Sequence, residues 1–170
     1  MISKEPGRQT PAPWINVIAN PIFGFLASEA GSGHTWSQNS RENKLTPWAN
    51  DPVSDPPGEA IYVRDEETQQ VWSPTALPMR DAAGRYVARH GHGYSVFEHV
   101  SRGIALELTV FVPPSDAIKI SRLAITNTSG RPRRLSVTGY VEWVLGVTRS
   151  GSAPFIVTAV DAANGALLAR

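Results

Sequence analysis

Cysteine is absent from this 170-residue chain, which excludes a disulfide framework and thiolate metal sites. An excess of one charge is absent too, because 16 Lys and Arg stand against 15 Asp and Glu and leave a net charge of +1. A row of phosphates needs a basic excess, so we expect no nucleic-acid partner. The chain also lacks a run approaching the ~20 apolar residues of a membrane helix, and it lacks the apolar core of a signal peptide. We expect a cytoplasmic chain without a membrane segment.

Long helices have little room in this sequence. Fourteen Gly and fourteen Pro are spread along the chain, and both residue types interrupt helices. Short strands and turns are therefore expected. The clearest hairpin joins Tyr94–Val100 to Ile104–Val112 through Ser101-Arg102-Gly103, and its second strand alternates apolar and polar residues.

A second hairpin is predicted from Ile118–Asn127 and Leu135–Leu145, around a turn at 128–132. In the first of these strands the apolar phase slips, which predicts a β-bulge near Ser121-Arg122. In the other strand the apolar residues share one face, which we expect to enter the core. They are Leu135, Val137, Val141, Trp143 and Leu145.

Further short strands indicate an all-β protein. With no helical period in any segment, about eleven strands predict an antiparallel β-sandwich. We expect residues 1–10 to be a linker or flexible N-terminus and residues 11–170 to form the sandwich domain. The additional strands are predicted at Trp14–Ile18, Phe23–Ser28, Ala60–Arg64, Val71–Trp72, Arg85–His90, Phe155–Val160 and Ala166–Ala169.

Several motifs, matching in order and spacing, carry a family resemblance. The longest runs from Trp36 to Trp48 and continues from Asn50 to Glu59. In these two stretches, the chain resembles the cellobiose- and chitobiose-phosphorylase family, formerly glycosyltransferase family 36. The stretch from Pro11 to Asn20 narrows the resemblance to the phosphorylase-like region of cyclic β-1,2-glucan synthases. The other matching stretches are Tyr62–Thr68 with Val71–Thr75, Arg89–Ser95 with Phe97 and Glu98, and Arg133–Val137 with Tyr140–Trp143.

The resemblance implies a fold and a division of labour. In that family a galactose-mutarotase-like supersandwich precedes a helical (α/α) barrel, and the barrel carries the catalytic aspartate. The resemblance therefore implies a non-catalytic sandwich domain, incomplete at its C-terminus, that packs on a downstream barrel and helps to bind β-linked glucan or oligosaccharide. The parent protein is expected to be a glycoside phosphorylase or glycosyltransferase that can lie at the inner membrane. We expect this chain alone to be inactive, to use no cofactor or metal, and to form a homo-oligomer.

The irregular stretch Ser37–Glu59 is the best candidate for a sugar contact, because loops of this length are commonly functional. An indole face can stack on a pyranose, and planar polar side chains can bind neighbouring hydroxyls. A structural interpretation stays open, in which Arg41 and Glu42 form an ion pair and the tryptophans close the sandwich end. The candidate carbohydrate-binding residues are Trp36, Asn39, Arg41, Glu42, Asn43 and Trp48.

One histidine cluster could serve a different function. His90-Gly91-His92, followed by Glu98 and His99, offers the only metal-like pattern, and a cupin-like enzyme could use His90 and His92. The glycines favour a turn instead, which makes surface or domain-interface histidines the expected outcome. A free-standing carbohydrate-binding module is the other alternative function.

The remaining motifs are predicted to be structural. Gly31-Ser32-Gly33 and Gly91-His92-Gly93 do not open helices, so we interpret them as hairpin turns and not as phosphate loops. A solvated edge is expected for Arg131, Arg133 and Arg134. Six carboxylates are expected in loops or turns without an apolar setting that would raise a pKa, which disfavours a self-contained hydrolase. They are Asp51, Asp55, Glu59, Asp65, Glu66 and Glu67.

Overall fold

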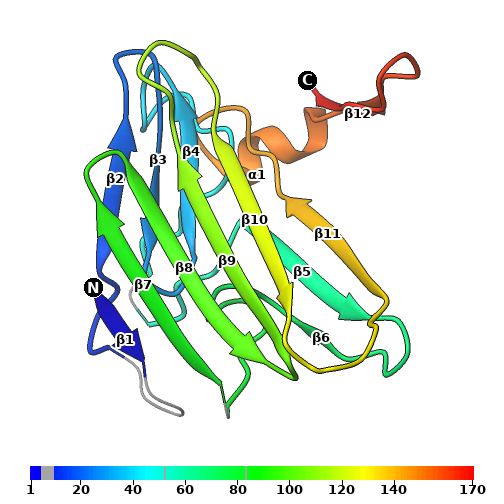
Figure 1. Cartoon of the computed structure of the whole chain (residues 1–170). Helices are drawn as coiled ribbons and strands as arrows, with labels where there is room; N and C mark the ends of the chain where they lie inside the picture. Colours follow the sequence, from blue (N-terminus) through cyan, green and yellow to red (C-terminus); the bar gives the residue numbers. More distant parts are fainter. Residues whose placement is uncertain (5–9, 52, 83) are drawn as a thin grey trace.

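A five-stranded antiparallel sheet, here sheet A, forms one layer of the computed structural model, which describes residues 1–4, 10–51, 53–82 and 84–170. Its strands follow the order β1-β7-β8-β9-β10 (Figure 1). Along β8 and β9 buried residues alternate with more exposed ones, as expected for strands with one face in a core. The bounds are Ile2–Lys4 for β1, Arg85–Gly91 for β7, Tyr94–Ser101 for β8, Ile104–Phe111 for β9 and Ile120–Asn127 for β10.

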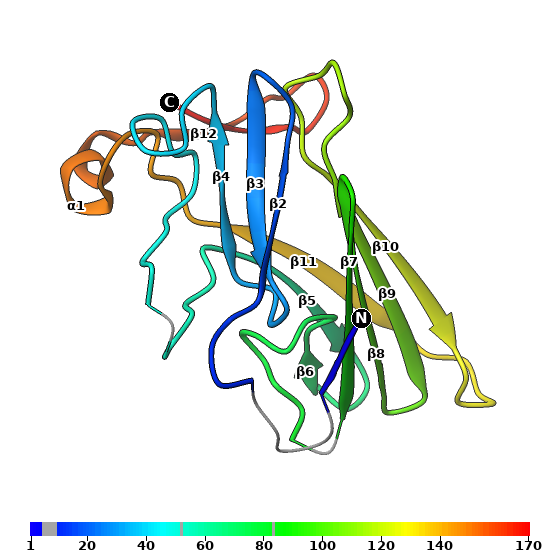
Figure 2. The same ribbon diagram turned by 90° about the vertical axis from the view of Figure 1, so that its left-hand side faces the viewer.

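Two three-stranded sheets make up the second layer and face different ends of sheet A (Figure 2). Sheet B has the order β2-β3-β4, with β2 at Ile15–Ala19, β3 at Phe23–Ser28 and β4 at Gly33–Ser37. Sheet C has the order β11-β5-β6, with β11 at Leu135–Val141, β5 at Glu59–Asp65 and β6 at Val71–Trp72. The predicted antiparallel sandwich is confirmed.

The C-terminal segment lies outside these layers. It contains the one-turn helix α1 at Arg149–Ser152, the 3₁₀ turn η1 at Ala153–Phe155, and a small hairpin of β12 (Thr158–Val160) and β13 (Leu167–Ala169). No longer helix occurs in the described part of the chain, in agreement with the distribution of Gly and Pro.

Two clusters of buried side chains hold the layers together. The first joins sheets A and B, and the second joins sheets A and C, so the apolar face of β9 contributes to both. The apolar residues predicted to alternate along this strand are the ones that enter the core. The first cluster centres on Phe25, Phe97, Leu108 and Val110, and the second contains Val63, Trp72, Ile104 and Leu106.

The predicted hairpin of β8 and β9 is confirmed. Its two turn residues, Arg102 and Gly103, have φ values of 54° and 74°, the positive pair that a type I′ turn requires. The turn at Gly91-His92-Gly93 joins β7 to β8, and Gly31-Ser32-Gly33 lies at the turn from β3 to β4, so both glycine motifs are hairpin turns as predicted.

The second predicted hairpin is wrong. β10 pairs with β9 in sheet A, whereas β11 pairs with β5 in sheet C, so the chain crosses between layers after residue 127. The predicted bulge is also wrong, because the register runs unbroken from Ile120 opposite Phe111 to Asn127 opposite Ile104. Leu123 packs against the core clusters on the inward face. Ile120, three residues earlier in β10, lies on the opposite face, so the apolar phase changes within the strand without a bulge.

The apolar face of the predicted strand at 135–145 does not enter the core as expected. β11 ends at Val141, and most of its length is exposed because it is an edge strand that pairs only with β5. Leu135 alone of the predicted face packs on a core cluster. Val144, outside that face, is buried and donates its backbone N–H to the Leu45 carbonyl at 2.9 Å.

Two short strands were missed in the sequence. Ile2–Lys4, within the predicted linker at 1–10, forms β1 and pairs with β7, while 5–9 of that linker lie outside the described residues. β4 carries His34, Thr35 and Ser37 and so lacks an apolar alternation. Its polar residues are covered because the loop that follows folds back over them.

Candidate functional site

The loop between β4 and β5, residues 38–58, is tied to the strands beneath it. Leu45 donates its backbone N–H to the Thr35 carbonyl at 2.8 Å, and the Thr46 hydroxyl accepts the Thr35 N–H at 2.8 Å. Further along, the Ser28 hydroxyl donates to the Asp55 carboxylate at 2.6 Å. These bonds reach both β3 and β4, so the loop is held at several points on the outer side of sheet B.

An aromatic stack anchors the middle of this loop. The imidazole of His34 lies between two indoles, with ring centroids 5.1 Å from Trp36 and 4.9 Å from Trp48, and its plane is within 7° of the Trp48 ring. His34 is fully buried, and burial is the main reason that its pKa falls to about 4. The ring is therefore neutral near pH 7. Trp48 keeps 46 % of its surface exposed although one of its faces is covered by His34.

The polar residues of the predicted site lie on a separate turn. The Asn39 side-chain oxygen accepts the backbone N–H groups of Arg41 and Glu42, each at 2.9 Å, and the Asn43 amide donates to the Ser37 carbonyl at 3.1 Å. These bonds fix the turn and leave Arg41 and Glu42 in solvent. The Arg41 Nε lies 3.2 Å from Glu42 Oε1, with the arginine side chain 85 % exposed.

The six predicted residues thus separate into two groups. Trp36 and Trp48 are brought together through His34, which was not predicted as part of the site. The ion pair considered in the structural interpretation exists, but such an exposed pair adds little stability. The signal for His34 was weak, because a histidine in a polar strand gives no hint of which loop will cover it.

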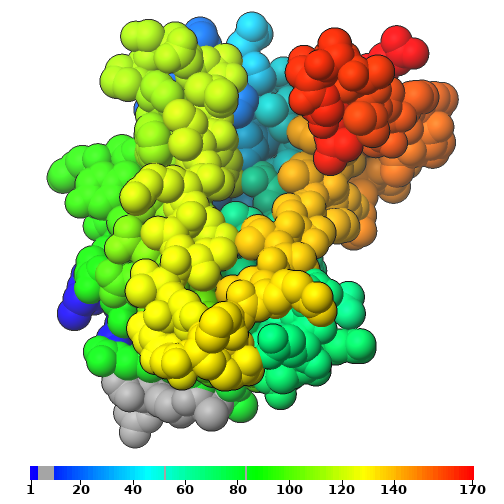
Figure 3. All heavy atoms as spheres, turned by 45° about the vertical axis from the view of Figure 1, so that its right-hand side comes forward, coloured from blue at the N-terminus to red at the C-terminus, as the bar shows by residue number. Residues whose placement is uncertain are grey.

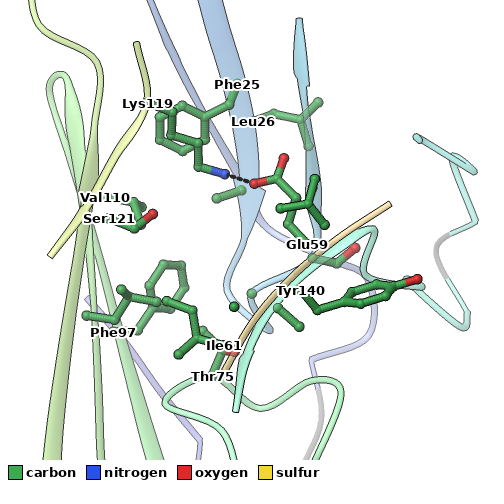
Figure 4. A pocket seen from close by; sticks show the side chains of 18 residues that line it. Phe25, Leu26, Glu59, Ile61, Thr75, Phe97, Val110, Lys119, Ser121 and Tyr140 are labelled. Carbon is green, nitrogen blue, oxygen red and sulfur yellow. Dashed lines mark hydrogen bonds and ion pairs between the residues drawn. The ribbon is translucent and has the colours of Figure 1, made fainter. Parts of the chain in front are cut away.

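A larger hollow lies between β10 of sheet A and β11 of sheet C, with residues of sheet B in its lining. Two adjoining cavities of about 260 and 350 Å³ share Glu59, Lys119, Ser121 and Val141 in their lining. Figure 3 shows the hollow between the yellow β10 side and the orange C-terminal part, with blue and cyan atoms at its floor. Its walls are mainly apolar, and Phe97, Ile61 and Phe25 line one cavity (Figure 4).

An ion pair crosses this hollow. Lys119 Nζ lies 2.6 Å from Glu59 Oε2 and 4.5 Å from the centroid of the Phe25 ring (Figure 4). Burial raises the pKa of Glu59, but the charge and hydrogen bond of Lys119, with hydroxyl bonds from Thr35 and Thr46, outweigh burial and lower it. Glu59 was expected in a loop without an apolar setting; instead it starts β5 among apolar side chains. It remains a carboxylate and cannot serve as a proton donor near neutral pH.

A second ion pair corrects one of the three arginines expected at a solvated edge, since Arg131 and Arg134 are exposed as expected but Arg133 is not. Arg133, Nε 3.1 Å from Asp65 Oδ2, has a side chain only 6 % exposed, while Asp65 is fully buried. Hydrogen bonds from Arg133, with backbone bonds from Glu67 and Thr68, lower the pKa of Asp65 to about 2. The prediction failed because the partner lies 68 residues away in the sequence. Asp65 ends β5 and is not a solvated turn carboxylate.

The histidines do not assemble into a metal site. His90 Nδ1 lies 2.9 Å from the Ser95 hydroxyl, whereas His92 lies in the exposed turn. His99, expected near the surface, is buried, and its ring stacks on Tyr86 at 3.9 Å. Burial lowers the pKa of both His90 and His99. Nowhere in the described ranges do three His, Asp or Glu side chains lie close enough to hold a metal ion.

Among the residues that the structure describes, no helix is long and apolar enough to cross a membrane.

Comparison with known proteins gives a consistent result. The family model described as "Glycosyl hydrolase 94, supersandwich domain" matches residues 1–170. The chain is 44 % identical over 163 residues to the cyclic β-(1,2)-glucan synthase NdvB of Rhizobium meliloti (strain 1021), covering 96 % of this chain and 6 % of that protein.

Two phosphorylases are also similar. The N,N'-diacetylchitobiose phosphorylase of Vibrio furnissii is 36 % identical over 137 residues, covering 78 % of this chain and 17 % of that protein. The solabiose phosphorylase of Paenibacillus borealis is 31 % identical over 141 residues, covering 82 % and 18 %. The chain therefore spans less than a fifth of the length of these relatives.

Proposed function

Because the chain belongs to the glycosyl hydrolase 94 supersandwich domain family, we propose that it is a non-catalytic sandwich domain of a glycan phosphorylase or glycan synthase. In this proposal it packs on a catalytic (α/α) barrel within a longer protein. It also lends residues of the 38–58 loop to the binding of a β-linked glucan. The relatives support the substrate class, since their names refer to a β-(1,2)-glucan, to N,N'-diacetylchitobiose and to solabiose.

The observation that carries the proposal is that the 38–58 loop is fixed on sheet B by hydrogen bonds and by the His34–Trp48 stack, while its tip is exposed. Asn39 and Asn43 fix the turn while Arg41 projects into solvent, and Trp48 is half exposed on a buried histidine. The Trp48 indole and the backbone that carries Arg41 are already positioned, so binding a ligand mainly has to order the Arg41 side chain. That combination suits contact with a sugar presented by a neighbouring domain.

The carboxylates support a non-catalytic role. Glycosyl transfer with inversion needs an acid that stays protonated until it reaches the leaving oxygen. The pKa values of Asp51, Glu59 and Asp65 are all lowered, so these groups are ionised near neutral pH. We accordingly expect this chain alone to release no glucose 1-phosphate from β-linked gluco-oligosaccharides.

Substitution of Arg41 in the longer protein tests the proposal. Arg41→Ala should raise KM for the glucan by about tenfold, as loss of one charged contact does, and leave the melting temperature unchanged. Arg122→Ala is the matched control, since Arg122 is also exposed and faces Glu107 at 3.8 Å on sheet A. Unchanged kinetics for both Arg41→Ala and Trp48→Ala, or a large loss of stability in both, would contradict the sugar-contact role.

A free-standing carbohydrate-binding module is the second candidate. The half-exposed Trp48 favours it, because a flat aromatic surface can bind a sugar without a second domain. Titration of the 170-residue chain with linear and cyclic β-1,2-glucans decides between the two. Affinity that matches the longer protein's affinity would favour the module, and much weaker affinity would favour the accessory domain.

A further inference from the structure

A small cavity lies between the 38–58 loop and the segment that follows β11. It measures about 160 Å³ and is bounded by residues from 47–49 and 56–58 on one side and by Glu142 and Arg149 on the other. Neither of these two residues belongs to the site predicted from the sequence. The volume is below the ~300–1,000 Å³ of pockets that enclose drug-sized ligands, so the cavity suits one small ring.

The apolar walls of the cavity are rigid. Pro47, Pro56 and Pro57 contribute rings with restricted backbones, and Trp48 is held by its stack on His34. Gly58 makes the wall possible, because a β-carbon at this position would lie 2.6 Å from the Pro47 ring. Such walls are formed before a ligand arrives, which lowers the entropy lost on binding.

The opposite wall carries an ion pair with unused capacity. Arg149 Nε pairs with Glu142 Oε1, and Glu142 is positioned by its backbone N–H, which donates to the Gly58 carbonyl at 2.8 Å. Within the described residues, the second carboxylate oxygen and the terminal guanidinium nitrogens make no other hydrogen bond. The wall can therefore still accept hydrogen bonds through Glu142 and donate them through Arg149.

These two walls define the chemistry of a ligand. A flat apolar molecule would leave the ion pair without partners, and a simple anion or cation would meet a group of its own sign. A pyranose has apolar C–H faces for the indole and proline rings, and hydroxyls that both donate and accept. Because Glu142 and Arg149 offset each other in charge, a neutral sugar fits better than an acidic or amino sugar.

We propose that the cavity formed by Trp48, Pro47, Pro57, Glu142 and Arg149 binds one neutral pyranose unit at the end of a β-linked glucan. This inference rests on the proposed function and deepens it, because it adds a ligand class and two contact residues outside the loop. The sugar lies against Trp48 and the prolines, while Glu142 accepts from its hydroxyls and Arg149 donates to them. A single ring in so open a site should bind with a Kd on the order of 1 mM.

The test is a titration of the 170-residue chain, followed through the indole N–H signals of its five tryptophans by NMR. The probes are methyl β-D-glucopyranoside and a β-1,2-linked glucose disaccharide. We expect both to shift the Trp48 signal with similar affinity and to leave Trp14 unchanged, since Trp14 is exposed but lies outside the cavity. Glu142→Gln should weaken binding about tenfold without loss of fold, and Trp14→Ala is the matched control.

The outcomes separate this inference from the proposed function. Because Trp48→Phe removes the reporting indole, binding to this variant is followed through its backbone amide signals. Sugar binding that Trp48→Phe weakens but Glu142→Gln does not would place the sugar on the loop outside this cavity, which overturns the inference and leaves the proposed function standing. Trp48→Phe retains a ring to stack on His34, so it guards against loss of fold. Shifts with the disaccharide alone would overturn the single-ring assignment. If neither sugar moves any indole signal at concentrations well above the expected Kd, the assignment of a sugar to this cavity is overturned. The Arg41→Ala kinetics test the loop independently.

Discussion

Similar apolar residues are buried in the part of the chain before Val112 and mostly exposed in the part after it. Up to Val112, apolar residues of β3, β8 and β9 are buried in clusters that join two layers. After Val112, where every residue is described, Val144 is the only buried apolar residue. Phenylalanine shows the contrast best, since Phe25 is fully buried and Phe155 is 79 % exposed. Burial here depends on whether a facing layer is present, and residue type alone does not decide it.

The difference follows from where the sheets end. β10 is the last strand of sheet A and β11 is the last strand of sheet C, and the hollow crossed by Glu59 and Lys119 lies between them (Figures 3 and 4). An edge strand has no neighbouring strand on one side, so it buries less of its surface than a central strand does. Val141 and Trp143 after β10 therefore line the hollow, whereas the apolar residues of β3, β8 and β9 face a second sheet.

Replacing a phenylalanine by alanine in each part should give the largest difference in the free energy of unfolding. Phe25→Ala should lower the free energy of unfolding by about 3–5 kcal/mol, because it leaves a cavity in a packed core. Phe155→Ala should change it by less than about 0.5 kcal/mol, because the ring is mostly in solvent. Urea denaturation followed by circular dichroism measures both. Equal losses in the two variants would mean that the C-terminal part is packed as tightly as the core.

Removing a buried charge should give a smaller effect, and one that depends on pH. The pKa of Asp65 is about 2 in the folded chain, against about 3.9 in an unfolded one. A lowered pKa means that the carboxylate stabilises the fold fully above about pH 4, and that this contribution disappears as the pH falls towards 2. Asp65→Asn should therefore destabilise the protein at pH 6 and differ little from the original chain at pH 2.

The matched change after β12 is Asp161→Asn. Asp161 accepts the backbone N–H of Ala163 at 2.9 Å in the exposed terminal hairpin, and an asparagine oxygen can accept the same bond. Its effect at pH 6 should stay within about 0.5 kcal/mol. Urea midpoints for both variants between pH 2 and pH 6 check the comparison. A loss in Asp65→Asn that persists unchanged at pH 2 would show that packing, and not charge, explains it.

Sequence patterns were sufficient to predict strand pairing where the paired strands are joined by a short turn. The β8–β9 hairpin was predictable, because its turn at Arg102-Gly103 and its alternation lie within one short stretch. The pairing of β10 and β11 with different sheets was not, because adjacency in the chain favours a hairpin and only the tertiary arrangement separates them. The family resemblance identified the supersandwich without resolving either point.

The candidate site was predictable to a similar extent. The 38–58 loop was predicted as a candidate because it is long and carries Asn39, Arg41, Asn43 and Trp48, and Arg41 and Trp48 are exposed on it. The stack on His34 and the ion pair of Glu142 with Arg149 depend on residues from other elements meeting in space. Burial of charged groups such as Arg133 escaped prediction for the same reason, since a charge enters the interior only with a distant partner.

A charge on the open edge after Val112 should change the folding free energy little, but it should clearly change association. Val137 lies opposite the buried Val63, so it points to the inner side of sheet C, yet it is 50 % exposed. With β11 unpaired on one side, we expect the 170-residue chain to self-associate as its concentration rises. Val137→Lys places an inward-pointing charge on this edge and should reduce the mass seen by light scattering, while the free energy of unfolding changes by no more than about 1 kcal/mol.

Val100→Lys is the matched control, because Val100 is exposed on the central strand β8 of sheet A, away from any edge. A strictly monomeric chain at high concentration, or equal effects of the two lysines, would show that the exposed edge of β11 does not direct association.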